Sequence, residues 1–191
     1  INFNDFCMMK DDLIILSGGK NSHLYETSKK GDINSLVSIV DTLASNFKDN
    51  FFIEIQKTNR IDEDEFINNI LPISTEKGIP LVATNDVMFA SRSDYDVHET
   101  KVCINTGTTL NDPNRNRFFS EEQYFKSPIE MLETFKGLEE AVNNANEIAK
   151  LCNVSLKTEG YFLPKYPVPE SYNFDTFLKE LSNKNLKKII K

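Results

Sequence analysis

The sequence contains no tryptophan and only three cysteines, Cys7, Cys103 and Cys152. The cysteines lie far apart and form no CxxC pair, which argues against a zinc ribbon and is typical of a reducing compartment. No apolar run reaches the roughly 18 residues that a membrane-spanning helix requires. No Walker A or GxGxxG pattern follows a predicted strand, so a nucleotide-binding domain has no support from motifs. We therefore expect a cytoplasmic protein with buried cysteines.

A basic stripe is also missing. The formal net charge is -7 and the isoelectric point is about 5.0. Lysines gather only in the last dozen residues, where a solvated helix end explains them. Because neutralisation of phosphates supplies most of the affinity of sequence-independent DNA binding, the acidic balance argues against DNA binding by this segment itself.

Both ends of the chain resemble internal positions of a longer protein. The sequence begins with Ile1 rather than methionine, and it stops at Lys191 inside a segment with helical periodicity. We therefore expect these 191 residues to be a part of a longer chain.

Three short apolar runs alternate with amphipathic segments in the first half of the chain. The runs 13–16 (LIIL), 51–55 (FFIEI) and 81–84 (LVAT) are typical of buried strands, and the segments between them have helical spacing. Continuously apolar strands separated by helices predict a parallel sheet in an α/β fold. An α/β barrel, or a part of one, and an open doubly wound sheet both fit this pattern.

Helix boundaries are predicted from capping residues and breakers. Asp32 and Asp62 are candidate N-caps, and Pro72 is expected to kink or break the helix that contains it. The segment 161–172, rich in proline and aromatic residues, reads as an extended linker and a domain boundary. Four further helices are expected, namely Tyr95 to about Asn105, a helix that begins at Ser127-Pro128, 138–151 and 174–191.

The stretch 80–103 carries the two candidate functional residues, Asp86 and His98. Asp86 follows a predicted strand, and the carboxyl ends of strands are where ligands bind in α/β folds. A carboxylate and an imidazole can share a metal or act as base and orienting group. A divalent site needs three or four ligands, however, and His23 is the only other histidine. The alternatives are a turn or helix cap for Asp86 and a packing role for His98.

A resemblance to a known family rests on sequence blocks in a fixed order. The blocks FFIEIQKTNR (51–60), GIPLVATNDVMF (78–89), DVHETKVCI (96–104), TTLNDPNRNRF (108–118), EIAKLCNV (147–154) and YFLPKYPVPE (161–170) occur along the chain. In this order they resemble the alpha subunits of bacterial DNA polymerase III. The resemblance implies that residues 1–160 are the later part of the polymerase-and-histidinol-phosphatase (PHP) domain, a distorted (β/α)7 barrel. Residues 161–191 would be the linker and the first helix leading to the polymerase core (palm).

The same resemblance bears on metal binding. Family members with an active PHP domain hold metal ions through histidines and carboxylates at strand ends. Thr58 and Met88 stand at two of the histidine positions, and Asp86 is the ligand position that remains. Neither a hydroxyl nor a thioether replaces an imidazole well toward zinc or manganese. The resemblance therefore implies a degenerate metal site, and His98 matches a family position without an implied role.

For function, the resemblance implies a part of the replicative polymerase that carries no catalytic residues of its own. The parent protein would perform DNA-directed DNA synthesis with Mg2+ held by palm aspartates outside this chain. The segment would support the polymerase core and dock the proofreading exonuclease and other holoenzyme subunits. Two alternatives remain open: a free-standing PHP-type metal-dependent phosphoesterase, and an interaction module with no polymerase attached.

Overall fold

The computed structural model describes residues 3–8, 10–155, 160, 164 and 166–190. The chain divides into two compact units, Ile1–Asn153 and Val154–Lys191. The segment from 156 to 165 falls largely outside the described residues, so the division into a PHP part ending at 160 and a linker from 161 stays a prediction. Within the described ranges, no helix is both long and apolar enough to cross a membrane.

The first unit is built on a parallel sheet whose strands follow one another in the order β1-β2-β3. The strands are β1 (Ile15–Leu16), β2 (Phe51–Gln56) and β3 (Leu81–Thr84), and β2 pairs with both of its neighbours. On β2, Ile53 and Ile55 are fully buried on one face, while Glu54 and Gln56 project from the other. The predicted parallel α/β arrangement is confirmed. The described residues form three strands and no closed barrel, so the barrel stays a prediction.

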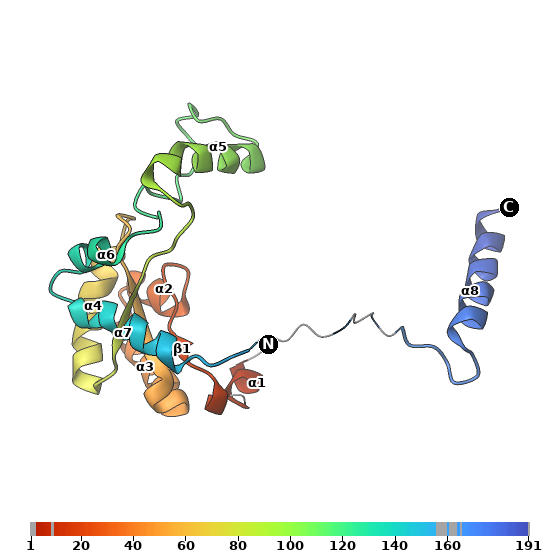
Figure 1. The fold of residues 1–191 in the computed structure, drawn as a ribbon, viewed down its shortest axis with the longest axis horizontal. Helices are drawn as coiled ribbons and strands as arrows, with labels where there is room; N and C mark the ends of the chain where they lie inside the picture. The colour runs from red at the N-terminus through yellow and green to blue at the C-terminus, as the bar shows by residue number, and fades with distance from the viewer. Residues whose placement is uncertain (1–2, 9, 156–159, 161–163, 165, 191) are drawn as a thin grey trace. The chain divides into compact units, whose positions relative to one another are not determined.

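Three helices cover the apolar face of the strands, and Figure 1 shows them gathered around the sheet. They are α2 (His23–Lys29), α3 (Ile33–Phe47) and α4 (Glu63–Lys77). Leu36 and Val40 of α3 and Ile70 of α4 are completely buried and form the core with the inward residues of β2.

The helix ends follow the capping predictions in one case and depart from them in another. The Asp32 carboxylate accepts a hydrogen bond from the Ser35 backbone N–H at 3.0 Å, which confirms the predicted cap of α3. α4 begins after Asp62 as predicted, but this residue has a φ of 72° and its side chain makes no capping bond. Its carboxylate lies 3.2 Å from Lys29 Nζ instead. The helix also continues through Pro72 without a break.

The remaining described elements are short helices and connections. An isolated parallel bridge joins Phe89 to Tyr124, and it brings the segment after β3 next to the segment 120–126. α7 (Glu139–Leu151) packs against β3 and buries Ala141 in the core. The other helices are α1 (Phe3–Met8), α5 (Tyr95–Thr106), α6 (Pro128–Thr134) and α8 (Phe174–Ile189), with 3-10 turns η1 (Lys10–Asp12), η2 (Lys48–Asn50) and η3 (Arg92–Asp94).

Candidate functional site

Polar side chains converge at the carboxyl ends of β2 and β3. Because side chains alternate along a strand, Glu54 and Gln56 point to the same face of β2. The strand pairing places Gln56 opposite Thr84 on β3. The Gln56 amide donates to the Glu54 carboxylate at 3.1 Å and to the Thr84 hydroxyl at 3.2 Å. Gln56 therefore links Glu54 and Thr84 on this face of the sheet.

Arg60 lies at the centre of this site, although it is four residues past the end of β2. Its Nε donates to the Thr58 hydroxyl at 2.8 Å and to Glu63 Oε1 at 3.0 Å. Its Nη1 lies 2.8 Å from Asp86 Oδ2, and its Nη2 lies 3.1 Å from Gln56 Oε1. The arginine side chain is only 8% exposed, so these contacts replace nearly all of its hydration.

Glu63 holds the turn that carries Arg60. Its Oε2 accepts the backbone N–H groups of Thr58 at 2.6 Å and Arg60 at 3.3 Å. Its Oε1 accepts the Thr58 hydroxyl at 2.7 Å as well as Arg60 Nε. Glu63 and Thr58 are both buried. The four hydrogen bonds and the facing guanidinium offset the cost of burying this carboxylate.

Asp86 closes the cluster from the side of β3. Its Oδ2 accepts a second hydrogen bond, from Gln123 Nε2 at 3.0 Å, besides the one from Arg60. The Gln123 backbone carbonyl in turn accepts the Met88 N–H at 2.8 Å. Asp86, Met88 and Arg60 line a hollow of about 560 Å3, which Lys20 and Arg117 also line.

Gly19 is needed because the loop after β1 passes directly over the site. A Cβ atom at position 19 would lie 2.2 Å from Gln56 Oε1, the same oxygen that accepts from Arg60. The neighbouring Ser17 hydroxyl accepts the Glu54 backbone N–H at 2.9 Å. The Gly18-Gly19 pair therefore allows β1 to connect to α2 without displacing the cluster.

The cluster influences two titratable groups beside it. Burial and then the charge of Arg60 lower the pKa of Lys20, whose ammonium donates to the Ile61 carbonyl at 3.0 Å. Burial, followed by the negative charge of Glu63, raises the pKa of Tyr25 to about 12. The Tyr25 hydroxyl donates to the same Ile61 carbonyl at 3.0 Å, so the neutral phenol anchors the turn after Arg60.

His98 does not join the cluster. Its ring packs against Phe89 and Phe119, with centroid separations of 5.4 Å and 4.6 Å. Its Nε2 is buried and makes no hydrogen bond within the described part of the chain. His98 is also not among the residues that line the hollow with Asp86. The structure therefore places it in an aromatic environment on α5, away from the strand ends.

The side chains that stand at the expected metal-ligand positions are engaged with other protein groups or exposed. The Thr58 hydroxyl is engaged with Glu63 and Arg60, and the remaining carboxylate, Asp86, is paired with a guanidinium. Met88 lines the hollow but is 40% exposed and offers only a thioether. Across the described residues, no group of three histidine, cysteine or acidic side chains is placed to hold a metal ion.

Sequence reasoning placed Asp86, Thr58 and Met88 at this site and missed Arg60, Glu63 and Gln123. One signal could have found Arg60: lysine and arginine number 22 together, and only four of these are arginine. Arginine in a lysine-rich chain indicates a place where the planar, multiply donating guanidinium is required.

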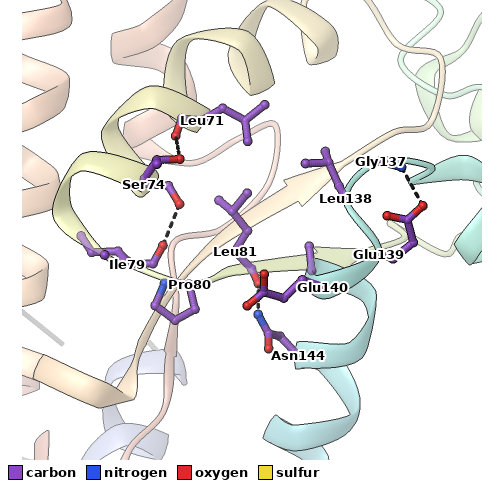
Figure 2. A pocket seen from close by; sticks show the side chains of 13 residues that line it. Leu71, Ser74, Ile79, Pro80, Leu81, Gly137, Leu138, Glu139, Glu140 and Asn144 are labelled. Atoms are coloured by element: carbon purple, nitrogen blue, oxygen red, sulfur yellow. Dashed lines mark hydrogen bonds between the residues drawn. The ribbon is translucent and has the colours of Figure 1, made fainter.

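A second cavity, of about 580 Å3, lies at the opposite end of β3. Figure 2 shows it between the end of α4 and the start of α7, with Asn144 donating to the Leu81 carbonyl at 2.8 Å. The Ser74 hydroxyl donates to the Ile79 carbonyl at 2.7 Å on the other wall. Its lining residues include Glu139 and Glu140 and no cationic side chain, histidine or cysteine.

The chain is similar to several curated proteins that share one name. The chain is 38% identical over 176 residues to DNA polymerase III subunit alpha of Pseudomonas aeruginosa, which covers 92% of this chain and 15% of the relative. It is 37% identical over 171 residues to the protein of the same name from Escherichia coli K12, covering 90% of this chain and 15% of that protein. The corresponding protein of Pasteurella multocida is 35% identical over 182 residues. No family model matches the chain.

These matches confirm the resemblance that the ordered sequence blocks indicated. The chain is similar to a segment of DNA polymerase III subunit alpha and spans about 15% of the length of the relatives that it matches.

Proposed function

We propose, from the premise that this chain is similar to a segment of DNA polymerase III subunit alpha, that it works within a polymerase of that kind. The full-length protein would carry out DNA-directed DNA synthesis in chromosome replication. Residues 1–160 would be the later part of its PHP domain, and 161–191 the linker and first helix toward the palm. The observation that carries this proposal is the identity of 38% along 92% of the chain.

The segment's own role in this proposal is structural. The Arg60 cluster joins the end of β2, the start of α4, the segment after β3 and the segment 120–123. A hydrogen-bonded ion cluster of this kind rigidifies the elements that it joins. Both carboxylates of the cluster, Glu63 and Asp86, are paired with Arg60, so we infer that the domain supports the polymerase core.

The partners in this proposal are proteins. The proofreading exonuclease and other holoenzyme subunits would dock on the domain in the cytoplasm, while the parent polymerase would contact DNA and hold Mg2+ outside this chain. The net charge of -7 supports protein contact over DNA contact. In a gel-shift titration, we expect the chain to bind duplex DNA no more tightly than an acidic control protein. Tight binding that weakens with salt would contradict this.

The test of a structural role uses the polymerase that contains this segment. We expect Arg60→Met to leave primer extension near the normal rate at low temperature and to accelerate thermal inactivation. Arg92→Met is the matched control, because that side chain is 54% exposed. A variant that loses primer extension while keeping its thermal stability would contradict a supporting role and place Arg60 in the chemistry.

The free-standing phosphoesterase remains the second candidate, because the hollow at the strand ends is large enough for a small phosphoester. Hydrolysis of p-nitrophenyl phosphate by the chain, measured with Mn2+ and with Zn2+, separates the two. Turnover that disappears in Asp86→Asn would favour the phosphoesterase, and absence of turnover with both ions would favour the structural role.

A further inference from the structure

Every nitrogen of the Arg60 guanidinium contacts an oxygen of the strand-end cluster. The oxygens are Thr58 Oγ1 and Glu63 Oε1 on Nε, Asp86 Oδ2 on Nη1, and Gln56 Oε1 on Nη2. They belong to four residues that reach the same point from β2, the turn after it, α4 and the segment after β3. The cluster is thus organised around a single cation.

The chemistry of these oxygens is that of a site for a hard divalent cation. Two carboxylates, one amide carbonyl and one hydroxyl are ligand types that Mg2+ and Mn2+ accept in proteins. Here the positive charge comes from a guanidinium, which is always protonated and matches several oxygens in one plane. The pairing of Glu63 and Asp86 with one guanidinium leaves these three groups with a net charge of -1.

The altered ligand positions lie in the same place. Thr58, which stands at a histidine position of the resembled family, accepts a hydrogen bond from Arg60 at 2.8 Å. Met88, at the second such position, lines the hollow together with Arg60 and Asp86. Thr58 and Met88, which stand at histidine positions of the resembled family, therefore lie at the same site as the Arg60 guanidinium.

We propose that Arg60 is a built-in cation that takes the place of a divalent metal at the ends of β2 and β3. It pairs with both Glu63 and Asp86 and keeps metal ions out of the cluster. A metal bound to Asp86 Oδ2 at about 2.0–2.2 Å would meet the guanidinium, whose Nη1 lies 2.8 Å from the same oxygen. Metal and arginine therefore compete for the same ligands.

Competition predicts a latent metal site that opens when the arginine is removed. The experiment titrates Mn2+ and Mg2+ onto the 191-residue chain as wild type, Arg60→Ala and the control Arg92→Ala. Bound Mn2+ is counted by electron paramagnetic resonance, and thermal unfolding is followed in parallel. We expect Arg60→Ala to bind about one Mn2+ at least about tenfold more tightly than wild type. Its unfolding midpoint should rise with Mn2+, since binding to the folded state stabilises it, whereas the control should not respond.

A double variant, Arg60→Ala with Asp86→Asn, tests whether the gained Mn2+ binding uses the cluster. We expect it to lose that binding. A folded Arg60→Ala chain that binds Mn2+ no better than wild type would overturn the proposal. If Arg60→Ala does not fold in any metal condition, the test is made on the wild-type chain, from its unfolding midpoint and its bound Mn2+. An unchanged wild-type unfolding midpoint in excess Mn2+ supports the proposal, and stoichiometric Mn2+ that is lost in Asp86→Asn overturns it.

Discussion

Two buried arginine–glutamate pairs in the first unit have the same chemistry and different surroundings. Arg60 and Glu63 have side chains that are 8% and 4% exposed, and Arg115 and Glu99 have side chains that are 7% and 2% exposed. Both oxygens of Glu63 accept hydrogen bonds from backbone and side-chain donors. Glu99 is bound by Arg115 through Oε2, and its Oε1 is buried without a partner within the described residues.

The difference follows from what each pair joins. The Arg60 pair lies where two strands and a helix converge, so backbone donors and neighbouring side chains are available on every side. The Arg115 pair joins α5 to the loop 107–119, and Arg115 Nε also donates to the Leu110 carbonyl at 3.3 Å. Because an unpaired buried polar atom carries a desolvation cost, we expect the Arg60 pair to stabilise the fold more than the equally buried Arg115 pair.

The largest effect is expected from Arg60→Met. Removal of the guanidinium leaves the buried Glu63 and the partly buried Asp86 without their cation, and breaking a buried pair in this way costs about 3–5 kcal/mol. Urea unfolding of the chain measures the loss. Arg92→Met, at a half-exposed position, is expected to cost about 0–1 kcal/mol. A loss of only about 0–1 kcal/mol in Arg60→Met would mean that the cluster adds little to stability.

The next largest loss of stability is expected from Glu63→Gln, and Glu99→Gln is the matching change in the other pair. Glu63→Gln replaces an acceptor of four hydrogen bonds with an amide whose NH2 would face donors, and it is expected to cost about 1–3 kcal/mol. Glu99→Gln should cost less, because one of its oxygens has no partner to lose. The free energies of unfolding of the two variants give the comparison directly. A larger loss for Glu99→Gln would reverse the ranking of the two pairs.

A smaller effect is expected from Thr58→Val, which preserves the shape of the side chain. The valine removes the hydroxyl that donates to Glu63 and accepts from Arg60. One lost side-chain hydroxyl with two partners costs about 1 kcal/mol. Thr42→Val is the control, since that hydroxyl bonds only the Ser38 carbonyl of its own helix on an exposed face. The prediction fails if both threonine variants unfold at the same urea concentration.

The effect expected from Arg115→Met is confined to one loop and one helix. Without the guanidinium, the loop 107–119 loses two bonds that fix it, one to Glu99 and one to the Leu110 carbonyl. Amide hydrogen exchange should accelerate in this loop and in α5 and remain unchanged in β2 and α4. Faster exchange throughout the core would show that the Arg115 pair stabilises the whole unit, as the Arg60 pair is expected to do.

Much of the fold was predictable from local patterns. The run FFIEI predicted β2 to within one residue, LVAT matched β3, and Asp32 marked the start of α3. Asp62 also marked the start of α4, but it adopts a left-handed conformation and its carboxylate pairs with Lys29 and does not cap the helix. Local preference is a weak constraint when a neighbouring helix supplies a charge.

Sequence alone determined the alternation of buried strands and amphipathic helices, because side-chain periodicity is a property of neighbouring residues. It also placed Asp86 just past a strand end. Only the tertiary structure decided that Arg60 would meet Asp86, 26 residues away, and that Gln123, 37 residues beyond Asp86, would bind the same oxygen. Such contacts depend on the strand order and on where each strand stops. No periodicity encodes them, and so the centre of the site became visible only in the folded chain.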